Sequence, residues 1–576
     1  MGQQKLNVVL CWHMHQPWYR DGLDGDYRLP WVYLHAMKDY SDMATHLEQH
    51  PRMRLVVNFS PVLLEQINDY AHQLQQYLQH NTPFKDRLLN LLAGLTPIPS
   101  DVQARSELIE ECQRCHAPRM IHPYPCFQRL LTMIGATDSV GIGRKKYKYA
   151  LEYLSDQYFL DLLTWYHLSW LGQALKLAPA VQTLMNKGSL FNAADRRSLL
   201  SIIHACVAGI IPRYRALAER GQIELSMTPY MHPIMPLLED FHSMNCAQPD
   251  APMPSSAHYP GGTERTHWHM EKGIAFFQQY FGQTPRGVWL SEGAVSDAEL
   301  ALLDKFQINW TATGEGVWRN SCQRSSCTTP ENIHNKRALF MPYRQGDNQV
   351  RLFFRDDGLS DLIGFKYSTW NATDAVADFV QNLENIRDFL GGDAAQQVVS
   401  IILDGENAWE YYPENAYAFL DSLYSSLTHS EVLQLSHFSD LQALPTQHLP
   451  NLCAGSWVYG SFSTWIGSPD KNRGWDYLVA AKQAFDTVSA AGTLSAEQQL
   501  AAERQLAVCE GSDWFWWFGD YNPADSVSDF EQLYRQQLMR LYDMLGLAVP
   551  EQLHVPLSTG NQAGAENAGT MRRNKA

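Results

Sequence analysis

Short, continuous apolar runs recur along the chain up to about residue 445, and several of them end at a polar or acidic residue. The run Val398 to Leu403 is mostly β-branched and is followed directly by Asp404 and Gly405. An uninterrupted run of this length is typical of a strand buried on both faces of a parallel sheet. We predict seven such strands: Leu6 to Trp12, Leu55 to Phe59, Gln222 to Met227, Gly287 to Leu290, Ile308 to Thr311, Val350 to Asp356 and Val398 to Leu403.

Helical patterns separate these runs. The segment Trp31 to Leu47, which follows the first run, has apolar residues at helical spacing. A strand, helix, strand order indicates a parallel sheet with helical crossovers. We set aside Ala338 to Tyr343 as part of a hairpin. Because seven strands are one fewer than the usual eight, we predict an α/β fold, an incomplete (β/α)7 barrel.

Two further stretches contain helical patterns and no strand signal. Residues 61–221 predict a mostly helical insertion within a barrel domain that spans residues 1–445. Residues 446–549 predict a C-terminal helical bundle domain that closes the cleft. Residues 550–576 are rich in Gly, Asn and Ala, so we expect a disordered tail there.

The composition is that of a globular protein of two or three domains. The chain has 576 residues, too many for one ordinary core, and is 45% hydrophobic and 18% charged. The net charge of -16 argues against a nucleic-acid partner and suits a neutral ligand better than a polyanion. Many of the 17 Trp and 27 Tyr residues lie beside Gly, Asp or Pro, which indicates sugar stacking, although core packing is the alternative.

The sequence offers no candidate for membrane insertion or export. The apolar run Leu6 to Trp12 is too short for a signal-peptide core and leads into His and Pro. No run approaches the roughly 18 apolar residues needed to span a bilayer. We therefore expect a cytoplasmic protein without a membrane partner.

Ten cysteines are scattered along the chain, and a cytoplasmic location predicts that most are buried thiols. Cys112-Gln113-Arg114-Cys115-His116 matches the pattern of covalent haem attachment. That attachment follows export, and the stretch also has the pattern of an ordinary polar helix. No second Cys pair stands at zinc-finger spacing. We expect no cofactor.

Two predicted strands lead to carboxylates, Glu292 and Asp404, and each acid has tryptophan nearby. Parallel barrels carry their chemistry at the carboxyl ends of their strands, and glycosidic bond cleavage requires two acids. The alternative for Glu292 is a first-turn acid of the helix that begins near Ser296, although Ser296 is the better N-cap. The alternative for Asp404 is a structural Asp-Gly turn.

Five stretches in order resemble glycoside hydrolase family 57. They are His13-x-His15-Gln16-Pro17, Gly221 to Glu224, Gly287 to Glu292, Leu403 to Asn407, and Gly455-Ser456-Trp457 through Trp465 to Asn472. Glu510 to Trp517 also resembles a bundle segment of the amylase and amylopullulanase members. The resemblance implies a retaining α-glucan enzyme on a seven-stranded barrel, with Glu292 as nucleophile and Asp404 as general acid/base.

A retaining mechanism places requirements on both acids. In such a mechanism the two carboxyl groups should lie about 5–5.5 Å apart. Asp404 must be protonated and Glu292 ionised. The apolar strand and Trp409 would supply the desolvation that raises the pKa of Asp404. We expect Glu406 to accept a substrate hydroxyl or to orient Asp404.

His13 and His15 face the same way in an extended segment, so they suit a metal site, core packing or, as the resemblance implies, sugar hydroxyl binding. We adopt hydroxyl binding, together with Gln16, and expect no metal. For Glu224 the resemblance implies sugar contact, and a buried salt bridge is the alternative. Arg355 and Asp356 form a plausible ion pair beside the nucleophile. The remaining candidate substrate-binding residues are Asp356, Asp470 and four tryptophans that are stacking platforms or core residues: Trp289, Trp409, Trp457 and Trp465.

These features favour hydrolysis of α-1,4-glucan by an amylase or amylopullulanase type of enzyme. A 4-α-glucanotransferase is the alternative, because it uses the same covalent intermediate. The segments around Asp404 and Asp513 resemble amylopullulanase-type members and favour hydrolysis. Branching ranks lower, because branching members differ in the first motif and the tail. From other classes we consider a metal-dependent glycosidase or deacetylase, and a carbohydrate-binding relative without turnover, against which the presence of both acids argues.

Overall fold

A parallel barrel forms the centre of the molecule. The computed structural model describes residues 4–135, 151–325 and 328–560. Within them seven parallel strands neighbour one another in the order β8-β1-β2-β3-β4-β5-β7, and a bridge from Arg355, just after β7, to Ser400 of β8 completes the ring. The strands are β1 (Leu6–Met14), β2 (Leu55–Phe59), β3 (Ile223–Met227), β4 (Gly287–Val288), β5 (Trp310–Thr313), β7 (Arg351–Phe354) and β8 (Val398–Asp404). The prediction of a seven-stranded barrel is confirmed.

Three short strands extend this sheet. β6 (Tyr343–Gln345) pairs antiparallel with β7, β10 (Gln447–Leu449) pairs with β6, and β9 (Leu433–Leu435) pairs with β1. The predicted hairpin therefore exists, but its first strand begins at Tyr343. The preceding residues instead form the 3-10 helix η4 (Arg337–Phe340).

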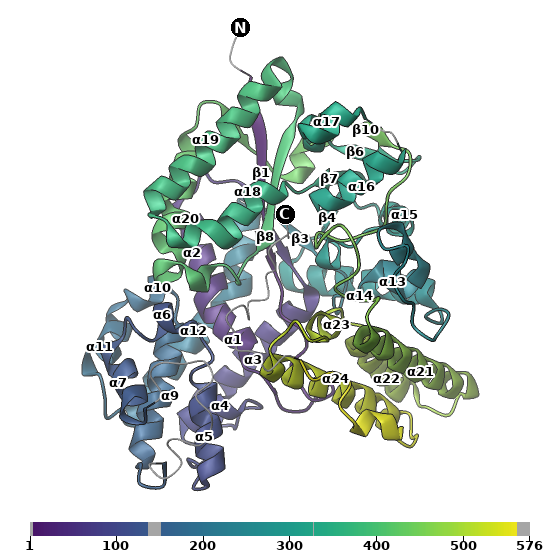
Figure 1. Ribbon diagram of the computed structural model, residues 1–576. Coiled ribbons are helices and arrows are strands. Elements are labelled where there is room, and N and C mark those ends of the chain that lie inside the picture. The colour runs from purple at the N-terminus through teal and green to yellow at the C-terminus, as the bar shows by residue number, and fades with distance from the viewer. Residues whose placement is uncertain (1–3, 136–150, 326–327, 561–576) are drawn as a thin grey trace.

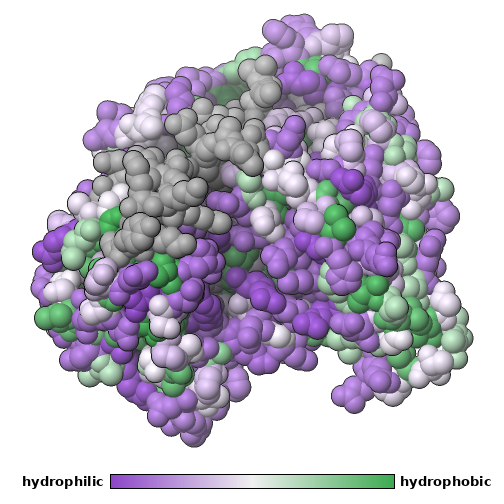
Figure 2. All heavy atoms as spheres, turned by 60° about the horizontal axis from the view of Figure 1, so that its bottom comes forward, coloured by the Kyte–Doolittle hydropathy of each residue, from purple (hydrophilic) through white to green (hydrophobic). Residues whose placement is uncertain are grey.

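The register of the strands brings their carboxyl ends to one level. His13 of β1 lies opposite both Asp404 of β8 and Asn58 of β2, and Asn58 lies opposite Ser226 of β3. In Figure 1 these ends face downward, toward α1, α3 and α23. Figure 2 shows that side of the molecule as a largely hydrophilic face with a hollow near its centre.

The amino end of the barrel is closed by apolar residues. The 3-10 helix η10 (Phe438–Ala443) places the Phe438 ring 4.4 Å from Trp310 and 4.6 Å from Phe353. These rings belong to a fully buried interior cluster that includes Val9 and Val56. Among the described residues, the barrel interior is therefore filled by packed side chains at this end.

Helices surround the barrel as crossovers. The predicted helix Trp31 to Leu47 is interrupted by a π-helical turn, η1, in its middle. The elements between strands are α1 (Trp31–His35), η1 (Ala36–Tyr40), α2 (Ser41–Gln49), α13 (Met235–Glu239), η2 (Phe241–Cys246), α14 (Gly262–Phe281), η3 (Ser291–Gly293), α15 (Asp297–Lys305), α16 (Glu315–Ser325), α17 (Pro330–His334), α18 (Asp357–Asp361), η5 (Leu362–Lys366), η6 (Tyr367–Thr369), α19 (Ala372–Leu390), η7 (Gly391–Gln396), η8 (Trp409–Tyr411), η9 (Pro413–Ala416) and α20 (Tyr417–His429).

A helical insertion separates β2 from β3, as predicted, and lies at the lower left of Figure 1. Its helix α12 begins at a capping box. The Asn192 side chain accepts from the Asp195 backbone N–H, and the Asp195 side chain accepts from the Asn192 backbone N–H. Such a box satisfies amide groups that a helix start leaves open. The helices are α3 (Pro61–His80), α4 (Arg87–Ala93), α5 (Val102–Glu111), α6 (Ala117–Met120), α7 (Pro125–Met133), α9 (Asp156–Trp170), α10 (Gln173–Lys176), α11 (Pro179–Lys187) and α12 (Ala193–Glu219).

The C-terminal region is helical, as predicted, and lies at the lower right of Figure 1. Its helices are α21 (Pro469–Ala491), α22 (Ala496–Cys509), α23 (Asp513–Trp517) and α24 (Ala524–Met544). The segment predicted as a disordered tail differs from expectation in its first residues. It forms the 3-10 helix η11 (Glu551–His554) and buries Leu553 and Leu557, because apolar side chains occur there among the polar ones. The rest of the predicted tail, residues 561–576, lies outside the described residues.

The cysteines are not all the buried thiols that were expected. Cys246 of η2 and Cys453 form a disulfide, whereas Cys112 and Cys115 are free thiols. His116 Nδ1 lies 3.0 Å from the Glu410 carbonyl oxygen. No helix in the described parts of the chain is long and apolar enough to cross a membrane.

Candidate active site

Glu292 is the middle residue of η3, a strained turn that follows β4 by a few residues. Its backbone has φ 58 and ψ 22, in the left-handed region, which costs a non-glycine residue roughly 1–3 kcal/mol and is frequent at functional sites. Gly293 also has φ 58, and a Cβ there would lie 2.9 Å from Trp289. Helix α15 begins later and uses Ser296 as its N-cap. Glu292 therefore precedes α15 and does not cap it, unlike the alternative of a first-turn acid.

A loop that precedes the C-terminal helices holds Glu292. Gly455 pairs with Val295 through two backbone hydrogen bonds of 2.9 and 3.2 Å. Trp457 donates its backbone N–H to the Glu292 carbonyl (3.1 Å) and its indole Nε1–H to Glu292 Oε2 (2.9 Å). The side chain and the backbone of Glu292 are thus fixed by the same residue.

Asp404 is the last residue of β8, opposite His13. Its Oδ2 accepts a hydrogen bond of 2.9 Å from Asn407 Nδ2. Burial raises the pKa of the Asp404 carboxyl above its ordinary value, against the opposing effects of Asn407, His15 and Arg355. A raised pKa keeps the proton that a general acid must deliver.

Three imidazole rings stack at the end of β1. The centroids of His13 and His15 are 5.6 Å apart, those of His13 and His232 are 5.4 Å apart, and those of His15 and His232 are 3.7 Å apart. Burial, together with the neighbouring imidazoles, lowers the pKa of His13 to about 3 and that of His232 well below its ordinary value. Both rings are therefore neutral at pH 7, when an imidazole can donate one hydrogen bond and accept another.

Polar side chains orient the stacked rings. His232 has one nitrogen, Nε2, that is buried and has no hydrogen-bond partner among the residues that the structure describes, which leaves it available to a hydroxyl group placed beside it. The other contacts are His13 Nδ1 with Asn58 Oδ1 (2.6 Å), His15 Nδ1 with Ser60 Oγ (2.8 Å), His15 Nε2 with Asp513 Oδ1 (2.9 Å) and His232 Nδ1 with Ser512 Oγ (2.8 Å). Ser512 and Asp513 begin α23, so the C-terminal helices contribute to the site.

The same cluster is a candidate metal centre by composition. The ligand atoms of His15, His232 and Asp513 lie within 4.8 Å of one another, and a His/Asp set suits zinc. The ring planes of His15 and His232, however, are parallel within 12° at 3.7 Å. An imidazole binds a metal along the nitrogen lone pair, in the ring plane, so an ion in the plane of one ring lies far from the plane of the other. The arrangement does not fit one ion held by both rings.

Glu406 lies behind the histidines and is buried. Its Oε1 accepts from the His15 backbone N–H (3.3 Å) and from Gln16 Nε2 (3.2 Å). Burial, with a contribution from the Asp404 charge, raises the pKa of Glu406 well above its ordinary value. These two contacts are to the segment that carries His15 and Gln16 and not to Asp404, so both expected roles, accepting a substrate hydroxyl and orienting Asp404, stay predictions.

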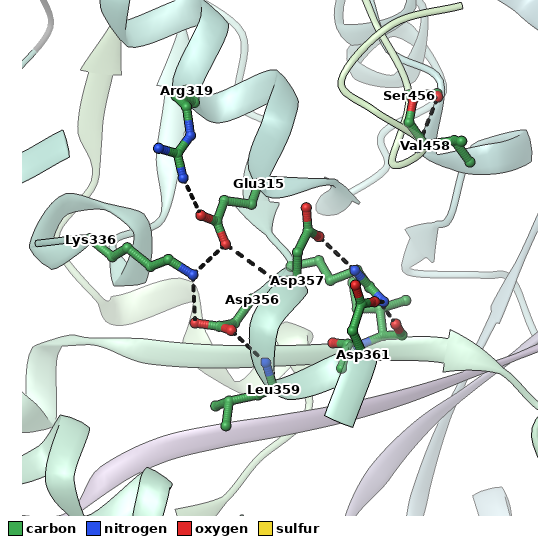
Figure 3. A network of polar contacts seen from close by, with 12 residues as sticks. Glu315, Arg319, Lys336, Asp356, Asp357, Leu359, Asp361, Ser456 and Val458 are labelled. Atoms are coloured by element: carbon green, nitrogen blue, oxygen red, sulfur yellow. Dashed lines mark hydrogen bonds and ion pairs between the residues drawn. The ribbon is translucent and has the colours of Figure 1, made fainter. Parts of the chain in front are cut away.

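A network of charged residues adjoins the site where the barrel closes (Figure 3). Arg355 donates to Asp357 (2.6 Å) and Asp361 (2.9 Å). On the other side, Glu315 Oε2 accepts from Lys336 Nζ at 2.7 Å. The guanidinium of Arg355 also lies 5.5 Å from the centre of the Trp457 ring. Arg355 therefore pairs with Asp357 and Asp361, and not with Asp356 as expected.

Glu224 is not brought to the carboxyl ends of the strands. It is the second residue of β3, and its carboxylate accepts from Trp310 Nε1 (2.7 Å) and from the Ser439 backbone N–H (3.1 Å). Ser439 belongs to η10, which covers the amino end of the barrel. The expected sugar contact is therefore withdrawn, because η10 covers Glu224 at the amino end of the barrel. The carboxylate is satisfied by an indole and a serine instead of the salt bridge that was the alternative.

The four tryptophans separate into one candidate platform and three core residues. Trp289, Trp409 and Trp465 are at most 1% exposed, and the Trp409 indole donates to the Gly405 carbonyl (2.8 Å). Their expected role in stacking on sugar is withdrawn, because packed side chains already cover their faces. Trp457 is partly exposed and remains a candidate.

Two acids have local roles. Asp356 caps α18 through a 2.8 Å bond to the Leu359 N–H, and Lys336 Nζ lies 3.9 Å from its carboxylate. Asp470 lies in the first turn of α21 and pairs with Arg473 at 2.6 Å. The contacts of both acids indicate structural functions, and substrate binding by either stays a prediction.

The site also contains residues that the sequence analysis did not select. His232 follows β3 and has φ 59, a left-handed conformation that sequence does not reveal. Its signal was a His-Pro pair soon after a predicted strand. Asp513 lies in a segment identified by resemblance, but nothing local indicated that it would reach His15. Asn58 is the polar residue next to the end of the otherwise apolar strand β2, which was a usable signal.

The fold and the site together define a barrel enzyme with its polar residues at the carboxyl ends of the strands. The sequence profile of glycosyl hydrolase family 57 matches residues 9–451, which is more than half of the chain. The protein belongs to this family.

Solved structures with the same fold have several activities. A family 57 branching enzyme from Pyrococcus horikoshii shares 14% identity at a TM-score of 0.55, covering 96% of this chain and 97% of its own. The α-amylase AmyC from Thermotoga maritima shares 13% at 0.55, covering 96% of each. The 4-α-glucanotransferase from Thermococcus litoralis shares 14% at 0.51, covering 94% of this chain and 60% of its own. No curated protein sequence matches. At these identities the likeness concerns the fold alone.

Proposed function

We propose that the protein is a retaining enzyme that cleaves α-1,4-glucan, of the α-amylase or amylopullulanase type. The observation that carries this proposal is the difference in environment between two acids, Glu292 and Asp404. Glu292 is held on a strained turn by the Trp457 indole N–H, and Asp404 ends β8 with a raised pKa. A nucleophile and a general acid require this division of roles.

In the proposed reaction Asp404 gives its proton to the glycosidic oxygen while Glu292 Oε attacks the anomeric carbon. The bond to the leaving sugar breaks, and a glycosyl ester of Glu292 forms. Asp404, now ionised, takes a proton from water, and the resulting attack on the anomeric carbon releases the sugar and Glu292. The neutral imidazoles of His13 and His232 would exchange hydrogen bonds with the hydroxyl groups of the cleaved sugar.

Transfer to a second sugar is the alternative outcome at the same site. A 4-α-glucanotransferase forms the same ester and resolves it with a sugar hydroxyl. The structural relatives include amylase, glucanotransferase and branching enzymes at similar TM-scores, so they do not separate these activities. The preference for hydrolysis comes from the segments around Asp404 and Asp513.

Incubation of the pure protein with maltoheptaose, followed by chromatographic separation of the products, tests the proposal. We expect only shorter maltooligosaccharides. A ladder that extends above the starting length would replace hydrolysis by transfer. No product from any linear or branched α-glucan would reject the substrate class. Activity that a chelator removes would instead favour a metal-dependent glycosidase.

A further inference from the structure

The indole of Trp457 lies between a carboxylate and a cation. Its Nε1–H donates to Glu292 Oε2 (2.9 Å), and the Arg355 guanidinium lies over its face, 5.5 Å from the ring centre. This distance is within the roughly 6 Å range of a cation–π contact. The backbone of Trp457 packs closely on Gly314, where a Cβ would lie 2.6 Å from the Trp457 Cα, and the Trp457 ring makes an edge contact with Trp289, with the centroids 5.2 Å apart.

Arg355 is itself fixed from three sides. Nε donates to the Ile402 carbonyl of β8 (2.7 Å), Nη1 to Asp357 (2.6 Å) and Nη2 to Asp361 (2.9 Å). The residue is buried, and two acids compensate its charge. Three of its N–H groups are thus directed at these oxygens, while the guanidinium carbon lies 5.5 Å from the centre of the Trp457 ring.

We propose that Arg355 is a positioning residue for Glu292 and acts through Trp457. The cation withdraws electron density from the indole face it covers, which makes Nε1–H a stronger donor to the carboxylate. The same contact fixes the angle of the ring and therefore the direction of the hydrogen bond. This role rests on the proposed function, since it assigns Glu292 to the chemistry.

A structural role for Arg355 is the competing explanation, because its bridge to Ser400 lies where the barrel closes. The two explanations differ in whether the effect of Arg355 depends on Trp457. If Arg355 only stabilises the closure of the barrel, its replacement lowers stability whatever residue occupies position 457. A positioning residue loses its effect on Glu292 once the indole is gone.

A double-mutant cycle with Arg355→Met and Trp457→Phe separates them. We compare kcat/KM and its acidic limb against pH, with thermal unfolding measured in parallel. Arg319→Met is the matched control, because it removes an arginine of the same network that pairs with Glu315 (2.7 Å) and not with Trp457.

We expect Trp457→Phe to lower kcat/KM about 10- to 100-fold, the range for a lost hydrogen bond to a charged group. Its acidic limb should move to higher pH. Arg355→Met should lower kcat/KM about 10-fold with the same direction of shift, and the double variant should stay within about threefold of Trp457→Phe. The proposal would be overturned if the losses of kcat/KM in the two single variants multiplied in the double variant. It would also be overturned if Arg355→Met lowered the melting temperature and left the acidic limb unchanged. Arg319→Met should match the wild type.

A second measurement does not require activity. In protein with isotopically labelled tryptophan, the Nε1–H resonance that disappears in Trp457→Phe should titrate with Glu292 and lose this titration in Glu292→Gln. In Arg355→Met its midpoint should move to higher pH. A resonance insensitive to Arg355→Met would refute the relay even if the protein cleaves α-glucan. A shifted resonance in an inactive protein would reject only the proposed function.

Discussion

Gly293 is the residue whose replacement should most selectively disturb the nucleophile. It follows Glu292 and has φ 58, and a Cβ at this position would lie 2.9 Å from Trp289 and 3.4 Å from the Cβ of Trp457. Gly293→Ala therefore adds both a left-handed alanine and a clash. Trp457 contacts Glu292 directly, and its ring centroid lies 5.2 Å from that of Trp289.

The expected size of the effect follows from these two terms. A left-handed alanine costs about 1–2 kcal/mol, and overpacking in a filled interior costs about 1–3 kcal/mol. Together they predict a loss of stability of about 2–5 kcal/mol. If the clash is relieved by moving Trp457 by about 1 Å, the displaced nucleophile lowers kcat/KM about 100-fold.

Gly282→Ala is the control for backbone strain. Gly282 has φ 70 and caps α14, and apart from its chain neighbours no described residue has an atom within 4 Å of the place that a Cβ would occupy, so this variant carries the strain without the clash. We expect it to lose about 1–2 kcal/mol and to keep full activity. Thermal unfolding and kcat/KM are measured for both variants. If Gly293→Ala behaves like Gly282→Ala in both assays, the packing described around Glu292 is incorrect.

Three further predictions concern the acids. Glu292→Ala and Asp404→Ala should each abolish turnover while circular dichroism shows a retained fold; near-normal rates in either would remove that residue from the mechanism. Asn407→Ala deletes a hydrogen bond that lowers the pKa of Asp404, so the alkaline limb of kcat should move to higher pH, and an unmoved limb would contradict acid catalysis by Asp404. In Glu510, burial raises the pKa, but Arg265 and His269 outweigh it and bring it to about 2 from 4.5. Because the folded-state value is the lower one, the carboxylate stabilises the fold above pH 4.5 and loses this effect as pH falls toward 2. Glu510→Gln should cost about 3 kcal/mol at about pH 7, and the difference in melting temperature should narrow in acid; a constant difference would refute the pairing.

The strands of the barrel were predictable because they are buried on both faces. Both faces of β1, β2 and β8 are covered, so the sequence shows unbroken apolar runs, and the predicted bounds differ from the observed ones by at most two residues. The helix Trp31 to Leu47 was predicted whole, but its π-helical turn was not. A turn of this kind depends on packing against other elements, and the period of the apolar residues does not record it.

The depth of a side chain along a strand was not predictable. The alternation of Glu224 with apolar neighbours correctly indicates an inward direction. Whether it meets a ligand depends on which end of the barrel is open, and Phe438 closes the end where Glu224 lies. Nothing in the sequence of η10 marks it as a plug.

Residues that meet across long sequence separations were also missed. His15 and Asp513 are 498 positions apart and share a 2.9 Å contact. Each occurs in a recognisable segment, but the sequence contains no information that pairs those segments. Tryptophans near these segments posed a related difficulty, since Trp289 and Trp457 both adjoin Glu292, and only the packing shows that Trp289 is fully buried.

The most direct test of the account is to trap the proposed glycosyl ester. The protein is incubated with a fluorinated α-glucosyl fluoride that forms the ester quickly and releases it slowly, then digested, and the labelled peptide is sequenced by mass spectrometry. The account predicts one sugar attached to the Glu292 carboxylate, and none in Glu292→Gln. A label on another carboxylate, or turnover of α-glucan with inversion at the anomeric carbon and no label, would contradict it.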